Sequence, residues 1–129
     1  MPHLHLEYSA NLEDVLNIGH LCEVLRAEAA SIEAFPTPGI RVRATRVDHY
    51  AIADGDPKHG FIDLSVRLRE GRSEDVKQAA ITQLFDRMKA FAEPEMAARS
   101  IALSAEMRDI NSALSPKFGN IRDHLKGAS

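Results

Sequence analysis

The chain has 129 residues, of which 44% are hydrophobic and 27% are charged, and its formal net charge is −3. This composition is typical of a globular protein with one core, so we expect a single domain over residues 1–129. The acidic balance argues against a nucleic-acid partner, no apolar run reaches the roughly 18 residues of a membrane span, and a lone cysteine excludes an internal disulfide. The first residues lack the basic and apolar pattern of a signal peptide, which favours a cytoplasmic protein.

The first half of the chain predicts a strand, a helix and a second strand. Residues 3–8 alternate apolar and polar side chains, which is the pattern of a half-buried strand. Asn11, with Asp14 three residues later, resembles a capping box and predicts the start of a helix. After a break around Pro36, residues 40–44 alternate again as a second strand. The helix between the strands has an apolar face at spacings of three and four, made by Val15, Ile18, Leu21, Leu25 and Ala29.

The second half repeats this plan after a turn at residues 54–57. Residues 62–69 alternate as a strand, and Ser73 is a good N-cap for a second helix. Pro94 makes continuation of that helix unfavourable, and residues 101–107 predict the last strand. We expect each helix to span about 15–20 residues. The apolar stripe of the second helix consists of Val76, Ala80, Leu84, Met88 and Phe91, widened by Ile81 and Phe85.

Two strand–helix–strand units predict an α+β fold with one four-stranded sheet. The strands within each unit are expected to be parallel, because a helix connects them. Two helices can cover only one face of such a sheet, so the other face needs cover, and a homo-oligomer is the simplest source. The tail at residues 116–129 is expected to form a short helix that docks on a neighbour.

Pro2 is the most informative residue of the chain. Initiator methionine is usually removed when proline follows it, and removal would leave a free secondary amine at Pro2. An α-amino group titrates at about 7.7–8.0, and burial or nearby cations lower its pKa, so it can serve as an acid–base group near neutral pH. The alternative is that Pro2 simply begins an edge strand, a position that proline tolerates well.

Several segments, taken in order and spacing, resemble the bacterial 5-carboxymethyl-2-hydroxymuconate isomerases of the tautomerase superfamily. The similarity runs through nearly the whole chain, although no single segment is diagnostic. These segments are Pro2-His3, Glu7, Phe35-Pro36, Gly39-Ile40-Arg41-Val42-Arg43, Val47-Asp48, Ala53-Asp54-Gly55, Gly71-Arg72-Ser73 and Ala102-Leu103-Ser104.

The resemblance implies a pair of β-α-β units per subunit, a homotrimer packed sheet to sheet, and an active site around the amino-terminal proline. Members of this family isomerise a dienol di- or tricarboxylate formed in homoprotocatechuate breakdown, without a metal or an organic cofactor. The proline amine takes a proton from the 2-hydroxyl group and returns one to carbon five, while arginines bind the carboxylates. In this chain the matching residues are Pro2 as the catalytic group and Arg41 and Arg72 as substrate-binding groups.

Elementary chemistry is consistent with these assignments. Arginine binds a carboxylate through two parallel hydrogen bonds, and its charge would lower the pKa of the proline amine. The same charge would stabilise negative charge that develops on the substrate. The alternative for Arg41 and Arg72 is that both are solvated surface residues, as most charged residues are.

Other signals in the sequence are weaker. His3 and His5 lie on one face of the first strand, as in some metal sites, but no third or fourth ligand with suitable spacing accompanies them. We therefore expect no metal. The same amine could instead serve a decarboxylase, a hydratase or a phenylpyruvate-type tautomerase, and the fold could also belong to a trimeric binding protein without catalytic activity.

Overall fold

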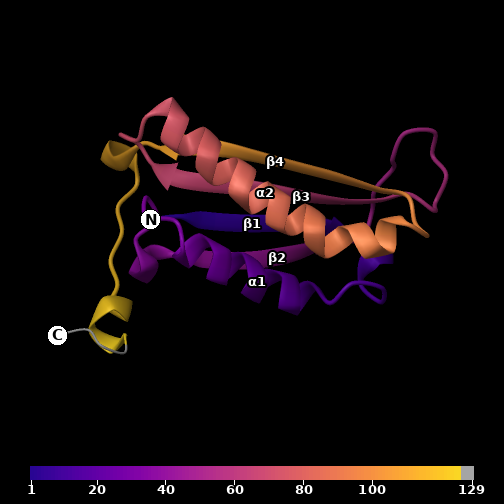
Figure 1. Ribbon diagram of the computed structural model, residues 1–129, viewed down its shortest axis with the longest axis horizontal. Helices are drawn as coiled ribbons and strands as arrows, with labels where there is room; N and C mark the ends of the chain where they lie inside the picture. The colour runs from indigo at the N-terminus through magenta and orange to yellow at the C-terminus, as the bar shows by residue number, and fades with distance from the viewer. Residues whose placement is uncertain (126–129) are drawn as a thin grey trace.

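The computed structural model describes residues 1–125 and arranges two helices against one face of a sheet (Figure 1). Strand β1 spans His3–Ser9 and β2 spans Arg41–Val47, with helix α1 (Ile18–Ala30) between them. Strand β3 spans Gly60–Arg69 and β4 spans Ile101–Ile110, with helix α2 (Glu74–Met96) between them. The predicted α+β architecture is therefore confirmed.

The sheet has the strand order β2-β1-β3-β4. Strands β1 and β2 are parallel, as are β3 and β4, which confirms the pairing expected within each strand–helix–strand unit. The two units meet through an antiparallel pair, β1 with β3. His3 at the start of β1 is consequently flanked by Arg41 on β2 and by Arg67 on β3, and this register decides which side chains surround the amino terminus.

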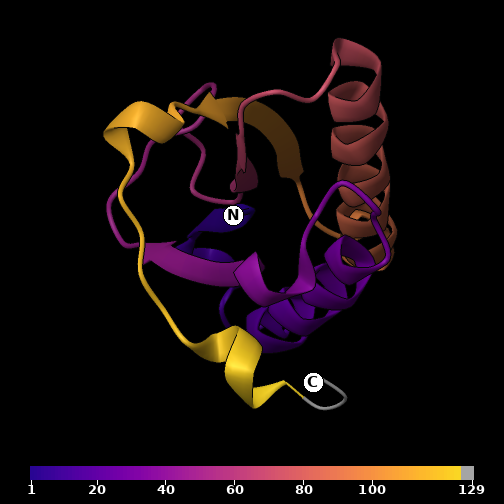
Figure 2. The same cartoon turned by 90° about the vertical axis from the view of Figure 1, so that its left-hand side faces the viewer.

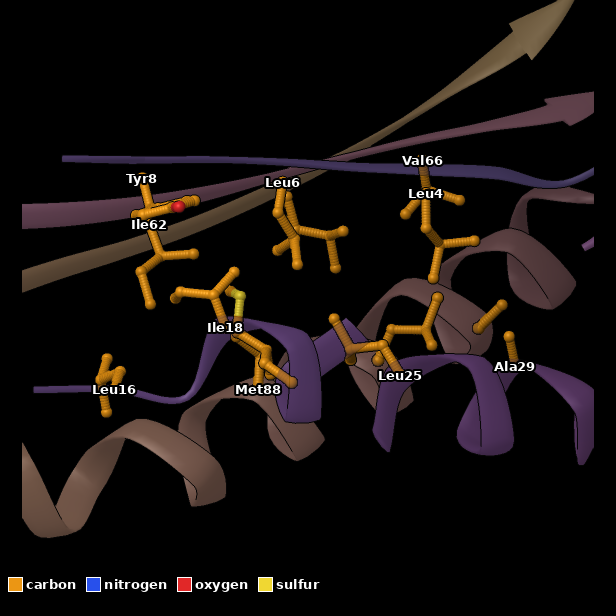
Figure 3. Packing of buried hydrophobic residues seen from close by; sticks show 14 of the residues in the cluster. Leu4, Leu6, Tyr8, Leu16, Ile18, Leu25, Ala29, Ile62, Val66 and Met88 are labelled. Carbon is orange, nitrogen blue, oxygen red and sulfur yellow. The ribbon is translucent and has the colours of Figure 1, made fainter. Parts of the chain in front are cut away.

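The hydrophobic core lies between the sheet and the two helices (Figure 3). Leu4, Leu6 and Tyr8 point from β1 toward the helices, where Leu25 and Met88 meet them. The apolar side chains of β3 are fully buried in the same layer between the sheet and the helices, which explains why they alternate strictly with polar residues. Both helices therefore cover the face that the sequence pattern predicts.

Helix α1 begins later than the sequence pattern suggests. The predicted capping box at Asn11 is wrong, because Asn11 accepts a hydrogen bond from the Ser9 hydroxyl and donates to the carbonyl of His59. The N-cap is Asn17, whose side chain accepts the His20 amide at 3.0 Å. Asn11 therefore fixes the loop before β3, and α1 has 13 residues, fewer than expected.

The second half also departs from the expectation in length. Helix α2 has 23 residues and continues past Pro94 to Met96. Proline removes the hydrogen bond to the carbonyl of Ala90, but both residues are exposed, so water can satisfy that carbonyl. Strand β4 extends to Ile110, three residues beyond the predicted end, because its pairing with β3 continues to Arg69.

The tail forms an extended arm instead of the expected helix. Residues 111–125, called here the C-terminal arm, contain only short 3₁₀ turns at Ser112–Leu114 and Ile121–His124. The arm crosses the end of the sheet at which the amino terminus lies (Figure 2). Phe118 on the arm is fully exposed, and the expected helix over residues 116–129 lies partly outside the described residues.

The sheet face that the helices leave open is polar. It carries His3 and His5 from β1, Arg41 and Arg43 from β2, and alternate residues of β3 and β4, among them Asp63, Ser65, Arg67, Ser104, Glu106 and Arg108. Polar side chains can face water, so this face does not need the cover by another subunit that the sequence pattern predicts. Outer edges that lack a strand partner remain on β2 and β4 within residues 1–125.

Candidate active site

The amino terminus is packed into the structure. Pro2 is fully buried at the entry to β1, and its carbonyl accepts the backbone amide of Arg41 at 3.1 Å. Gly39 permits this packing: a Cβ atom at that position would lie 3.1 Å from Met1 Cα and 3.2 Å from Pro2 Cδ. Met1 precedes Pro2 in the structure, so the Pro2 nitrogen belongs to a peptide bond there.

A cavity of about 520 Å³ opens beside Met1 on the open face of the sheet. Cationic side chains reach it from three elements, with Arg41 on β2, Arg67 and Arg69 on β3, and Lys117 on the C-terminal arm. Its remaining lining residues are His3, Ile110, Ser112, Ser115, Pro116 and Phe118. A second cavity of about 400 Å³ adjoins it and shares Met1, Arg41, Lys117 and Phe118.

The two arginines predicted from the sequence differ in their surroundings. Arg41 lines both cavities and donates one hydrogen bond, from Nη1 to the carbonyl of Gly39 at 3.0 Å. Arg72 is half-buried and donates to the carbonyls of Ala34 at 2.9 Å and Arg69 at 3.2 Å. The structure therefore brings Arg41 directly to the amino terminus, whereas Arg72 lines neither cavity.

Arg72 nevertheless contributes to the electrostatics of the terminus. Burial lowers the pKa of the Met1 amino group, and the positive charges of Lys117, Arg72, Arg69 and Arg41 lower it further. This is the direction that a neutral amine base requires. Ser73 next to Arg72 caps α2 by accepting the Val76 amide, as the sequence predicts.

Sequence reasoning missed three cationic residues of the larger cavity, Arg67, Arg69 and Lys117. The alternation in β3 places both arginines on the face opposite the core, but only the antiparallel register with β1 reveals that Arg67 lies next to His3. Lys117 could not be found from periodicity, because it lies on an arm without regular structure. A register prediction for β1 and β3 would have identified the two arginines.

The two histidines of β1 have separate environments. Burial, followed by the charges of Arg67, Arg43 and Arg41, lowers the pKa of His3 to about 4, so His3 is neutral at physiological pH. His5 Nε2 lies 2.9 Å from the hydroxyl of Thr45. In the part of the chain that the structure describes, no group of three or more His, Cys, Asp or Glu residues could hold a metal ion.

A larger groove of about 680 Å³ lies on the outer surface of the helices. Its charged lining residues are Glu28, Asp75, Asp86 and Arg87. Three carboxylates and one guanidinium would repel an anionic ligand, whereas the cavity beside Met1 would attract one. Among residues 1–125, no helix is long and apolar enough to span a lipid bilayer.

Comparison with known proteins finds a matching family model and similar solved structures. The family model described as 5-carboxymethyl-2-hydroxymuconate isomerase matches residues 2–125. The chain belongs to this family. The 5-carboxymethyl-2-hydroxymuconate Delta-isomerase of Escherichia coli is 30% identical over 126 residues, which cover 98% of this chain and 100% of the relative. The resemblance inferred from the sequence is thus confirmed.

Solved structures of the same family have the same fold. A 5-carboxymethyl-2-hydroxymuconate isomerase from Deinococcus radiodurans R1 is 37% identical, with a TM-score of 0.88 over 95% of this chain and 92% of that chain. A 5-carboxymethyl-2-hydroxymuconate delta-isomerase structure is 32% identical, with a TM-score of 0.89 over 100% of this chain and 96% of that chain. A fused 4-OT symmetric trimer, 17% identical with a TM-score of 0.60, covers 84% of this chain and 85% of that chain and shares the fold.

Proposed function

We propose that this member of the family isomerises 5-carboxymethyl-2-hydroxymuconate, with the amine of Pro2 as the proton shuttle. The observation that supports the proposal most strongly is that Met1, directly before the buried Pro2, lines one cavity together with several guanidinium groups. The proposed activity also agrees with the names of relatives that match 95% or more of the chain.

In the proposed mechanism, removal of Met1 exposes the secondary amine of Pro2. The neutral amine accepts the proton of the substrate 2-hydroxyl group, whose oxygen becomes a carbonyl as the double bonds shift. The resulting prolinium ion donates a proton to carbon five, which completes the keto isomer and regenerates the amine. The proton balance closes within this cycle, so the proposal requires no redox cofactor or metal.

Arg41 and Arg72 are proposed to bind substrate carboxylates and to stabilise the dienolate that forms after the first proton transfer. Arg72 lines neither cavity, so its proposed role rests on the family resemblance. Arg41 lines the cavity and uses one N–H group on Gly39. Arg72 uses two N–H groups on backbone carbonyls, which leaves three of its five donors for a ligand. Its bonds to Ala34 and Arg69 would also hold it in place as the substrate binds.

The proposed assembly is a homotrimer. Strands β2 and β4 are the two outer strands of the sheet, so the free edge of β2 in one subunit can pair with the free edge of β4 in the next. Such head-to-tail contacts form closed rings when the rotation between subunits permits it. The name of the fused 4-OT neighbour describes that protein as a trimer.

Turnover measurements on terminal variants test the proposed activity. Pro2→Ala, and separately a chain whose terminus is extended by uncleaved residues, should each lose roughly 100- to 10,000-fold in kcat for 5-carboxymethyl-2-hydroxymuconate. Lys89→Gln, on the exposed surface of α2, is the control and should keep the wild-type rate. Full activity of both terminal variants would refute the assignment, and a folded wild type without turnover of this substrate would favour the other enol carboxylates or a binding function.

A further inference from the structure

The cationic residues of the cavity beside Met1 have no acidic partners. Within residues 1–125, none of Arg41, Arg67, Arg69 and Lys117 forms an ion pair, whereas Arg108 on the same face pairs with Glu106. The chain as a whole carries a net charge of −3. Four unneutralised positive charges around one cavity repel one another, and an anionic ligand would relieve that repulsion.

The sheet places these charges on both sides of the amino terminus. Strand β1 lies between β2 and β3, so Arg41 flanks one side of the terminus while Arg67 and Arg69 flank the other. Two strand spacings separate β2 from β3, which is roughly 9–10 Å. A six-carbon dienol with a carboxylate at each end can span that separation.

The substrate carries more carboxylates than Arg41 and Arg72 would bind. The name 5-carboxymethyl-2-hydroxymuconate describes two carboxylates of the muconate chain and a third on the carboxymethyl group at carbon five. Binding with the 2-hydroxyl end on the β2 side would place carbon five and its substituent on the β3 side. Lys117 reaches the same cavity from the C-terminal arm.

We infer that Arg67 and Arg69 of β3, together with Lys117 of the C-terminal arm, form a subsite for the carboxymethyl carboxylate of the substrate. This inference rests on the proposed function. His3 lies beside Arg67 and stays uncharged at neutral pH, so the positive charge of the subsite comes from the three cationic side chains. The subsite makes the cavity selective for a tricarboxylate over a dicarboxylate that lacks this group.

Steady-state kinetics with two substrates test the subsite. The double variant Arg67→Gln/Arg69→Gln and the single variant Lys117→Gln are compared with wild type on 5-carboxymethyl-2-hydroxymuconate and on 2-hydroxymuconate. We expect the double variant to lose roughly 10- to 100-fold in kcat/KM for the tricarboxylate, with most of the loss in KM, and less than threefold for the dicarboxylate. The loss for Lys117→Gln should be smaller and in the same direction.

Arg108→Gln is the matched control, because Arg108 is directly opposite Arg67 in the sheet but does not line the cavity. It should keep the wild-type ratio of the two kcat/KM values. An equal loss on both substrates, or no loss on either, would overturn the subsite while leaving the isomerase activity in place.

A binding measurement separates failure of the subsite from failure of the proposed function. Calorimetry with propane-1,2,3-tricarboxylate and with glutarate measures carboxylate binding without turnover. The subsite predicts that wild type prefers the tricarboxylate and that Arg67→Gln/Arg69→Gln loses this preference. Retention of the preference in the double variant would overturn the subsite, whereas its loss in a protein without isomerase activity would support the subsite and refute the proposed reaction.

Discussion

The electrostatic surroundings of the amino terminus determine the pH at which it can act as a base. Burial and then the charge of Lys117 are the two largest causes of the lowered pKa of the Met1 amino group, and a Pro2 amine freed by removal of Met1 would lie next to the same cations. An amine accepts a proton only when it is neutral, so activity falls as the pH drops below its pKa. Each nearby cation therefore extends activity toward lower pH.

Lys117→Gln should consequently shift the acidic limb of the kcat/KM profile to higher pH. Loss of one nearby positive charge makes the protonated amine less unfavourable and raises its pKa. The profile is measured from pH 5 to 9 for wild type, Lys117→Gln and the surface variant Lys89→Gln. An acidic limb at the same pH in all three proteins would show that Lys117 does not act on the catalytic amine.

At the scale of elements, the loop between α1 and β2 positions the terminus. Gly39 ends the 3₁₀ turn Thr37–Gly39, is buried, and leaves no room for a side chain beside Pro2. Because Pro2 Cδ is bonded to the Pro2 nitrogen, a contact at 3.2 Å would move that nitrogen by a few tenths of an ångström. The precision of the proposed proton shuttle would thus depend on a residue that makes no contact through its own side chain.

Gly39→Ala should lower kcat by about 10-fold or more, because small displacements of a catalytic group are costly. The expected change in the free energy of unfolding is smaller, about 1 kcal/mol, because the turn itself does not require a positive φ angle. Steady-state kinetics and urea denaturation measure the two effects. Gly19→Ala, in an exposed turn of α1 with space for a methyl group, is the matched control. A wild-type kcat in Gly39→Ala would contradict the positioning role.

The elements whose periodicity is set by burial were predictable from the sequence. Strands β1 and β3 alternate because one face packs on the helices, and both helices show their buried stripe. The start of α1 was not predictable, because Asn11 and Asn17 are both suitable caps and only the contact of Asn11 with His59 decides between them. Helix α2 can continue past Pro94 because the carbonyl of Ala90, which loses its hydrogen bond there, is exposed to water. No local sequence pattern indicates that exposure.

The candidate site was predictable only where local sequence identifies its residues. Pro2, Arg41 and Arg72 were inferred from local sequence and family resemblance. The structure brings Met1 and Arg41 to one cavity, whereas Arg72 lines neither cavity. Arg67, Arg69 and Lys117 come from a different strand and from the C-terminal arm, so their proximity depends on the tertiary pairing of β1 with β3. Residues that come together only through the register of a sheet can be predicted as one site only when that register is known.

At the scale of the whole molecule, the open sheet face and the two strand edges bear on assembly. The face is polar, so association would depend on edge pairing and on the exposed Leu114 and Phe118 of the C-terminal arm. The proposed homotrimer would have three times the 14.2 kDa mass of one chain in solution. Sedimentation equilibrium at micromolar concentration measures the mass directly. A monomer that retains full isomerase activity under those conditions would contradict the proposed assembly.

The central claim concerns the Pro2 nitrogen, and an NMR titration of that atom in ¹⁵N-proline-labelled protein tests it most directly. The account predicts that the nitrogen titrates as a secondary amine, with a pKa lower than in a short peptide that begins Pro-His-Leu. A nitrogen that does not titrate, because Met1 is retained, or one whose pKa equals that of the peptide, would contradict the claim.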